Sequence, residues 1–307
     1  KSTAAVDTVT VGASEANVVY AVSSTNGAAL SFKGVDHATY TVELDGNESE
    51  FSGVEVDNVD VLDLSAGTAG AIDGSSWTNV GKIDLGFDNA GNAITYGAGQ
   101  TYDLTKDQTG LKLEMASTGT AQSVTIHAGD DNGTSSAVGT ITVGALDLNA
   151  GEDSIAGTVT IDATTANFTA TSLDMGAKMS LVITGDEDVT LGQATGGAAS
   201  SINAAASTGK ISLTTTTLAP TVTTGSGIDT ITADGVDVHT ITLGAGADIM
   251  NITNTTDGSS FDGGEGNDTF NVDDVDTYSV VGGAGDDEFT TAVALKATLF
   301  GGSGTDT

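Results

Sequence analysis

Apolar and polar residues alternate in short runs along the whole chain, a pattern typical of β-strands. In Thr230-Ile231-Thr232 the isoleucine faces one side and the threonines face the other, because successive strand residues point to opposite faces. Clusters of Gly, Asn, Asp and Ser separate the runs and are typical of turns. Strands are therefore predicted around residues 54–56, 61–64, 82–85, 94–96, 124–126, 141–143, 146–148, 159–161, 173–175, 181–183, 189–191, 202, 211–213 and 221–223.

From about residue 221 the apolar positions recur every 19 or 20 residues. Two apolar columns interleave about every ten residues, so each period contains two short strands and two turns. The first column is Val222, Ile241, Phe261, Val280 and Leu299, and the second is Ile231, Met250, Phe270 and Phe289. One period is then one coil of a solenoid, with two facing parallel sheets and a thin core between them.

The predicted fold class is therefore all-β, a parallel β-helix or β-solenoid. We divide it into residues 221–307 with regular repeats, residues 121–220 with weaker repeats, and residues 1–120 with irregular spacing. In the middle part Lys210 stands 19 residues before Asp229, where an aspartate would continue the pattern. The first part is either further solenoid with inserted loops or a separate sandwich, and we favour the solenoid. Lys1 and the incomplete repeat at Thr307 suggest a piece of a longer protein.

The charge balance limits the possible partners. The chain has 42 acidic and 8 basic residues, for a formal net charge of -34. Binding to nucleic acid or to an anionic membrane surface requires clustered Lys and Arg, so we expect neither. No run of 18 apolar residues predicts a membrane span. Cysteine is absent, which excludes disulfides and thiolate metal sites. The carboxylates are either solvated surface charge or ligands for cations.

A recurring turn favours cation binding for one group of carboxylates. Five turns have the pattern Gly-x-Gly-x-Asp, and their aspartates lie 19, 20, 19 and 19 residues apart. The predicted metal-binding residues are Gly225, Gly227, Asp229, Gly244, Gly246, Asp248, Gly264, Gly266, Asp268, Gly283, Gly285, Asp287, Gly302, Gly304 and Asp306. The last three turns begin with an additional glycine and match the nonapeptide G-G-x-G-x-D-x-U-x as far as the chain extends. Thr224 and Leu243 replace that glycine in the first two turns.

Calcium suits this turn because it takes about six to eight oxygen ligands at about 2.3–2.6 Å. Glycine lets backbone carbonyls turn inward, and the aspartate adds charge. Carboxylates stacked about 4.8 Å apart repel each other by roughly 1 kcal/mol in water, and more near a protein surface. A cation between coils reverses this repulsion, so several calcium ions are predicted and their binding should be coupled to folding.

Other acidic turns give weaker signals. On the opposite edge Asp237, Asp257 and Asp276 form a column that Leu295 ends. It is either a second calcium row or a set of ordinary Asx turns, which need no metal. The acidic turns at residues 129–133 and 84–92 occur once each. Trp77 is either an exposed contact or, as we favour, a cap on a local core.

The glycine-rich repeats of residues 221–307 resemble those of the RTX family of secreted bacterial proteins. The resemblance implies a calcium-loaded β-roll, export by type I secretion and folding outside the cell. Here the period is 19 rather than 18, and each coil has one nonapeptide rather than two, so the calcium row should lie mainly on one edge. The acidic, cysteine-free, Lys-poor remainder is similar in character to RTX-type surface-layer (S-layer) proteins, which assemble in two dimensions on Gram-negative cells.

Catalytic patterns are missing from the sequence, so we predict a protein that is not an enzyme. His37, His127 and His239 are far apart, and neither H-E-x-x-H nor G-x-S-x-G occurs. The predicted function is a secreted, calcium-dependent, self-assembling structural protein of the bacterial cell surface. The alternatives are a stalk of a large RTX adhesin and a calcium-binding module of a secreted polysaccharide-modifying enzyme. Self-association through calcium is the predicted interaction, and a cell-surface polysaccharide would be bound by parts outside this stretch.

Overall fold

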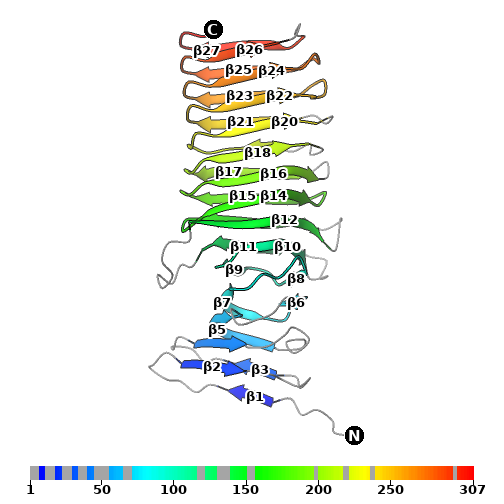
Figure 1. Cartoon of the computed structure of the whole chain (residues 1–307), viewed down its shortest axis with the longest axis vertical. Coiled ribbons are helices and arrows are strands. Elements are labelled where there is room, and N and C mark those ends of the chain that lie inside the picture. Colours follow the sequence, from blue (N-terminus) through cyan, green and yellow to red (C-terminus); the bar gives the residue numbers. More distant parts are fainter. Residues whose placement is uncertain are drawn as a thin grey trace.

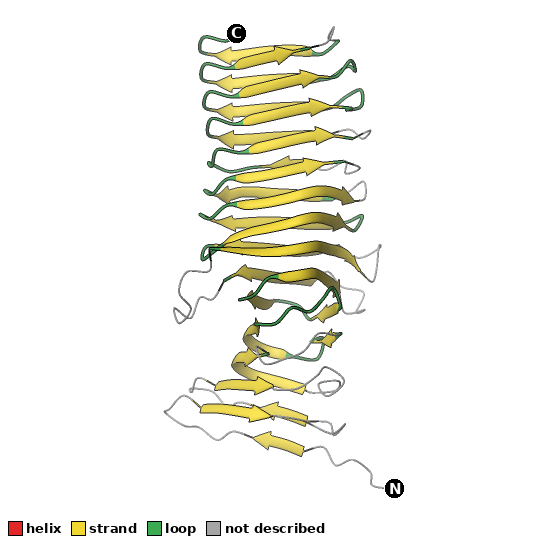
Figure 2. Cartoon of the chain, in the orientation of Figure 1, coloured by secondary structure: helices red, strands yellow, loops and turns green. Residues whose placement is uncertain are grey.

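The fold is a stack of parallel β-strands (Figures 1 and 2). The computed structural model describes residues 7–10, 18–22, 30–33, 40–44, 55–64, 71–115, 122–129, 139–150, 156–196, 200–216, 221–235, 239–292 and 296–307. Every pairing between the described strands is parallel. In the described part of the chain no helix is long and apolar enough to cross a membrane.

The described strands form two sheets. The larger, with 16 strands, is called sheet A here. It contains β1 (Asp7–Thr10), β2 (Val18–Val22), β3 (Leu30–Lys33), β4 (Tyr40–Leu44), β5 (Glu55–Asp63), β7 (Thr78–Leu85), β9 (Gln100–Leu104), β11 (Gln122–Ala128), β13 (Gly157–Ala163), β15 (Met179–Gly185), β17 (Ser201–Ser207), β19 (Thr221–Thr223), β21 (Thr240–Ala245), β23 (Ser260–Glu265), β25 (Ser279–Ala284) and β27 (Thr298–Ser303).

Sheet B has 11 described strands. It contains β6 (Ile72–Asp73), β8 (Ala93–Tyr96), β10 (Gln108–Met115), β12 (Thr140–Ala150), β14 (Asn167–Met175), β16 (Val189–Gly196), β18 (Ile211–Thr215), β20 (Thr230–Asp234), β22 (Ile249–Thr253), β24 (Thr269–Asp273) and β26 (Glu288–Thr291). From β5 onward the chain alternates between the sheets, and each strand pairs with the strand two later. This order confirms the predicted solenoid.

The first strands also belong to the stack. Strands β1, β3, β5, β7 and β9 follow one another in sheet A, and β4 pairs with both β2 and β5. The described strands of residues 1–120 therefore continue the parallel stack, and β1 to β5 all lie in sheet A. Figure 1 shows β1 at one end of the stack and β26 and β27 at the other. The division into three domains remains a prediction.

Equivalent apolar side chains stack in columns between the sheets. Val222, Ile241 and Phe261 are in-register partners in sheet A, as are Ile231, Met250 and Phe270 in sheet B. The Phe270 and Phe289 rings stack with centroids 5.1 Å apart and planes 9° apart. Both predicted columns are therefore confirmed, and they belong to one core of buried side chains that extends from Val56 to Val280. Trp77 is buried in this core, as favoured from the sequence.

Two local predictions were wrong. The runs at 141–143 and 146–148 are not separate strands, because β12 continues through Gly144 and Ala145. Lys210 is not the equivalent of Asp229: Ser212 pairs with Thr230, so Ile211 stands opposite Asp229. Burial decides this register, since the pairing of Leu213 with Ile231 keeps both side chains in the core.

The outer face of sheet A carries an unbroken row of hydroxyl side chains. Successive in-register partners are Ser123, Thr158, Ser180, Ser201, Thr221, Thr240, Ser260, Ser279 and Thr298. Like charges directly opposite each other destabilise a sheet, whereas hydroxyl pairs can hydrogen-bond. Ser201 Oγ, for example, donates to Ser180 Oγ at 3.1 Å. The outer row is therefore neutral despite the large negative charge of the chain.

Replacing Phe168 by Ala should lower the free energy of unfolding by about 3–5 kcal/mol, because it leaves a cavity in the core. Phe168 is fully buried and pairs with Ile141 and Val189 of the adjoining coils. Urea unfolding followed by circular dichroism measures the change. Thr169→Ala, next to it on the outer face, is the matched control and should cost much less. Equal losses for the two variants would contradict the assigned faces of β14.

Candidate metal centre

The five glycine-aspartate turns lie along one edge of the solenoid, where the chain passes from sheet A to sheet B (left edge in Figures 1 and 2). Gly244, Gly264, Gly283 and Gly302 are in-register partners in sheet A. The first four aspartates immediately precede β20, β22, β24 and β26. The structure therefore brings all 15 predicted metal-site residues into one column, which we call the aspartate column.

Close stacking of the backbone explains the glycines of this column. A Cβ atom on Gly266 would collide with the carbonyl oxygen of Gly246, and one on Gly285 would collide with that of Gly266. Gly266 also has a φ of +127°, which side chains disfavour. Carbonyl oxygens of one coil thus lie against the glycine α-carbons of the next.

One oxygen of each carboxylate binds the neighbouring backbone. Asp248 Oδ1 accepts a hydrogen bond from the Asp229 backbone N–H at 2.7 Å, and Asp268 Oδ1 accepts one from Asp248 at 2.9 Å. Asp287 and Asp306 continue the series toward the coil that precedes each, at 2.9 and 3.1 Å. Each turn is therefore locked to the next by an identical contact.

The other oxygen is buried without a partner. Oδ2 of Asp229, Asp248, Asp268 and Asp287 has no hydrogen-bond partner among the described residues, and these side chains are at most 1% exposed. A buried carboxylate oxygen without a partner is costly. Four equivalent oxygens in one column therefore favour a positively charged ligand at these turns.

Two kinds of oxygen converge in front of this column. Asp268 Oδ2 and the carbonyl oxygen of Gly282 both lie next to the Gly263 α-carbon, close to where a Cβ atom would be. The space beside Gly282 is approached in the same way by Asp287 Oδ2 and the carbonyl oxygen of Gly301. Each pair joins a carboxylate of one coil to a carbonyl of the next, which is the donor set that a hard cation prefers.

Burial raises the pKa of every buried aspartate in the column. The pKa of Asp248 rises to about 7, first because of burial and then because Asp229 and Asp268 carry the same charge, although the Asp229 backbone N–H opposes the rise. The pKa values of Asp268 and Asp287 are raised by burial and by neighbouring aspartates. Burial also raises the pKa of Asp229, which the Thr224 hydroxyl and the Ile211 backbone N–H counteract. The column is therefore unfavourable as a row of bare carboxylates.

These residues fit calcium by the chemistry of their oxygens. Among the described residues no three His, Cys, Asp or Glu side chains come together as a metal-binding group. A site built from one carboxylate per coil and backbone carbonyls does not need such a group. Calcium would supply the positive charge that the partnerless Oδ2 atoms lack.

Comparisons with known proteins gave no relative. No family model matches the chain, and neither does a curated protein or a solved structure. The resemblance to RTX proteins therefore rests on the repeats themselves and remains a prediction.

A second polar column beside the turns was not predicted. The Asp286 backbone N–H donates to Asn267 Oδ1 at 2.9 Å, and the Thr305 N–H donates to Asp286 Oδ1 at 2.8 Å. Both acceptors occupy the variable position just before the aspartate of the Gly-x-Gly-x-Asp turn. The signal in the sequence was Asn or Asp at this position, which is visible in only two repeats.

On the opposite edge protein donors bind the acidic groups. Asp257 Oδ1 accepts from the Thr277 backbone N–H at 2.7 Å. Asp274, which was not in the predicted column, accepts from the backbone and hydroxyl of Thr255 and from the Asp276 backbone N–H. Hydrogen bonds between neighbouring coils, together with one Asx turn at Asp274, therefore hold this part of the edge. Asp237 and Leu295 lie outside the described residues, and the second calcium row remains a hypothesis.

The acidic turn at 84–92 is also held by its own hydrogen bonds. Asp88 Oδ1 accepts from the backbone N–H groups of Ala90 and Thr109, both at 2.8 Å. Asn89 and Asn92 bind each other's carbonyl oxygens through their side-chain amides. Of the turn at 129–133 only Gly129 belongs to the described residues.

A buried polar cluster lies where β7, β9 and β11 adjoin. Asp103 contacts Lys82 Nζ through Oδ2 at 3.2 Å and His127 Nδ1 through Oδ1 at 3.3 Å. His127 Nε2 lies 3.0 Å from Thr165 Oγ1. Asp103 and His127 are both buried. The cluster links neighbouring coils by charge and hydrogen bonds, and the sequence spacing of the histidines did not predict it.

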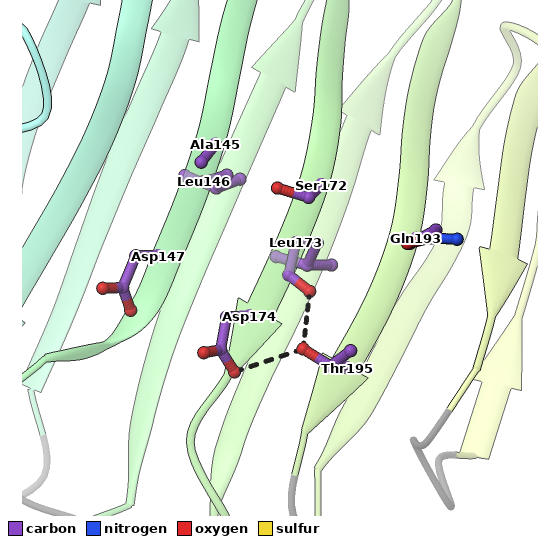
Figure 3. Close-up of a pocket in the computed structure, with 8 residues that line it drawn as sticks. All are labelled: Ala145, Leu146, Asp147, Ser172, Leu173, Asp174, Gln193 and Thr195. Carbon is purple, nitrogen blue, oxygen red and sulfur yellow. Dashed lines mark hydrogen bonds between the residues drawn. The ribbon is translucent and has the colours of Figure 1, made fainter.

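The outer face of sheet B has a shallow groove over β12, β14 and β16 (Figure 3). Its volume is about 350 Å³, and it is lined by Ala145, Leu146, Asp147, Ser172, Leu173, Asp174, Gln193 and Thr195. Thr195 Oγ1 donates to the Leu173 carbonyl oxygen at 3.3 Å and to Asp174 Oδ1 at 3.4 Å. Figure 3 shows Asp147 and Asp174 side by side on neighbouring strands. The groove could accept hydrogen bonds from a polar ligand, but it contains no aromatic side chain.

Gly266→Ala should destabilise the repeats more than Gly258→Ala. Both glycines have positive φ, which alone costs an alanine about 1–2 kcal/mol. Gly258 has open space where the Cβ would be, whereas Gly266 faces the Gly246 carbonyl, which should add about 1–3 kcal/mol. Urea unfolding in calcium measures both. Equal losses would mean that the coils are not packed as closely as the structure has them.

Without divalent cations the protein should become less stable as the pH rises toward 7. The folded pKa of Asp248 lies near 7 and the ordinary value is 3.8, so the folded chain binds a proton that the unfolded chain has lost. The stabilisation is complete below 3.8 and disappears as the pH passes about 7. Urea unfolding of wild type and Asp248→Asn across this range, in metal-free buffer, measures the slope. The variant should show a shallower slope, and parallel profiles would contradict the burial of this carboxyl.

Proposed function

We propose that this chain is a calcium-stabilised structural protein of the bacterial cell surface, which assembles with copies of itself. The observation that carries the proposal is the column of buried aspartates whose Oδ2 atoms have no partner. Calcium between the coils removes both the burial cost and the mutual repulsion. The ion is thus part of the folded structure.

An extracellular location follows from the dependence on calcium. Sites in extracellular modules bind calcium with dissociation constants of about 10⁻⁴–10⁻³ M, which only an external medium satisfies. The calcium-binding repeats of such a chain stay unfolded where calcium is scarce and fold after export. The absence of cysteine is compatible with this route, because calcium provides the stabilisation that disulfides often give to secreted proteins.

A scaffold role is supported by the long regular stack and by its surface. Copies that each carry a formal charge of -34 repel one another, so their association needs a counter-ion. Calcium can neutralise that charge, and the neutral hydroxyl row of sheet A offers one face on which copies can approach. Self-association, an S-layer or matrix location and the absence of catalysis belong to this proposal.

The test is to fold the chain with and without calcium. Far-ultraviolet circular dichroism and negative-stain electron microscopy are recorded in EGTA, then in a few millimolar calcium, and then with magnesium instead. Magnesium prefers about six ligands in a tighter octahedron, so it should not replace calcium. A gain of β-structure together with sheets or filaments is expected with calcium alone.

Two other outcomes separate the alternatives. Calcium-induced folding that leaves stable monomers would overturn the scaffold role and favour an adhesin stalk. No response to calcium in either measurement would overturn the metal site itself. As an internal control, Asp268→Asn with Asp287→Asn should weaken the response, whereas Asp257→Asn with Asp276→Asn on the opposite edge should leave it unchanged.

A further inference from the structure

The five turns of the aspartate column differ in the residue that comes just before each Gly-x-Gly-x-Asp. We call each turn a rung and this residue its leading residue. In-register pairing of the adjoining strand residues makes the leading residues equivalent. They are Thr224, Leu243, Gly263, Gly282 and Gly301.

In the last three rungs the aspartate uses the space that the leading glycine leaves open. Asp268 Oδ2 lies where a Cβ of Gly263 would be, and Asp287 and Asp306 lie in the same way over Gly282 and Gly301. A side chain at the leading position would therefore collide with the carboxylate. φ is not the reason for glycine here, since none of the three leading glycines has a positive φ.

In the second rung Leu243 fills the equivalent space. Leu243 points inward in the alternating pattern of β21, is fully buried and belongs to the core. Its carbons offer a cation no ligand. Asp248 is as deeply buried as Asp268 and Asp287, but the Leu243 side chain replaces the glycine that leaves room for Oδ2 in those turns.

In the first rung a hydroxyl takes this place. Thr224 is buried, and its hydroxyl faces the Asp229 carboxyl. Thr224 Oγ1 and Asp229 Oδ2 lack a hydrogen-bond partner of ordinary geometry among the described residues. The Thr224 hydroxyl can donate a hydrogen bond to the Asp229 carboxylate, because a hydroxyl donates and a carboxylate accepts.

We infer that calcium is held by the rungs of Asp268 and Asp287, where a buried Oδ2 atom and a carbonyl oxygen of the next coil come together, and that Leu243 and Thr224 close the rungs of Asp248 and Asp229 to the ion. The rung of Asp306 has the open leading glycine but no such carbonyl oxygen among the described residues. The inference rests on the proposed calcium function and narrows the predicted ion-binding rungs from five to two. Leu243 acts as the residue that determines where the ion row begins.

A consequence is that the solenoid has two kinds of coil. Coils up to β22 are held by the continuous apolar core and by hydrogen bonds, and do not require the ion. Coils from β23 onward include the open rungs and depend on it. In EGTA, amide hydrogen exchange should therefore accelerate in β23–β27 and change little in β13–β18.

The decisive measurement is the number of calcium ions bound per chain, by equilibrium dialysis and isothermal titration calorimetry with calcium alone. Asp287→Asn should lose one ion relative to wild type, and Asp248→Asn should lose none. Both replacements keep the size of the side chain and its Oδ1 acceptor, so they should fold alike. Leu243→Gly should gain one ion by opening the second rung, whereas Leu243→Ala retains a Cβ and should gain none.

Failure of the inference and failure of the calcium function give different results. If Asp248→Asn loses as many ions as Asp287→Asn, the rungs are equal and the inference is wrong, while the calcium function stands. If wild type and all variants bind no calcium, the proposed function fails and the inference fails with it. Should Leu243→Gly not fold, the pair Asp248→Asn and Asp287→Asn decides alone.

Discussion

Parallel strands stacked in register place each side chain directly over its equivalent in the next coil, about 4.8 Å away. Every residue must therefore tolerate a copy of its own kind as a neighbour. Apolar side chains do so by packing, as the stacked rings of Phe270 and Phe289 illustrate. Hydroxyl side chains do so by hydrogen bonding, as Ser180 and Ser201 do. Carboxylates do not, because like charges at this spacing repel.

The aspartate column is the exception that needs a compensating charge. The Oδ1 atoms of the column accept hydrogen bonds from the backbone of the preceding coil. The buried Oδ2 atoms have no hydrogen-bond partner among the described residues. On the opposite edge Asp257 and Asp274 have backbone and hydroxyl donors from the protein. The two edges thus differ in whether the protein itself satisfies its carboxylates. A cation that binds at one edge only would couple folding to the concentration of that cation.

The same stacking limits what else the chain can do. Catalytic chemistry usually needs different side chains close together at one site. A regular solenoid instead repeats the same side chain in each successive coil. The described exceptions occur where repetition breaks: the cluster of Asp103, His127 and Lys82 lies among the irregular coils, and the groove with Asp147 and Asp174 lies over the longest strands of sheet B. The regular coils therefore present the same side chains repeatedly along one face.

The solenoid and the aspartate column could both be predicted from the sequence. The period of 19 or 20 residues can be read directly, since the coils from residue 221 onward repeat the same apolar, glycine and aspartate positions. Burial of an alternating pattern then leaves only one register for each strand. Three features could be seen only in the folded chain: Ile211, not Lys210, stands opposite Asp229, β12 continues through Gly144, and Asp274 rather than Asp276 accepts the hydrogen bonds of Thr255. The fold also gives the reason why the replacement of a leading glycine by Leu243 matters, because a carboxylate from the same turn approaches the place of the Cβ. Such contacts depend on how one coil packs on the next, and the spacing of residues in the sequence does not show this packing.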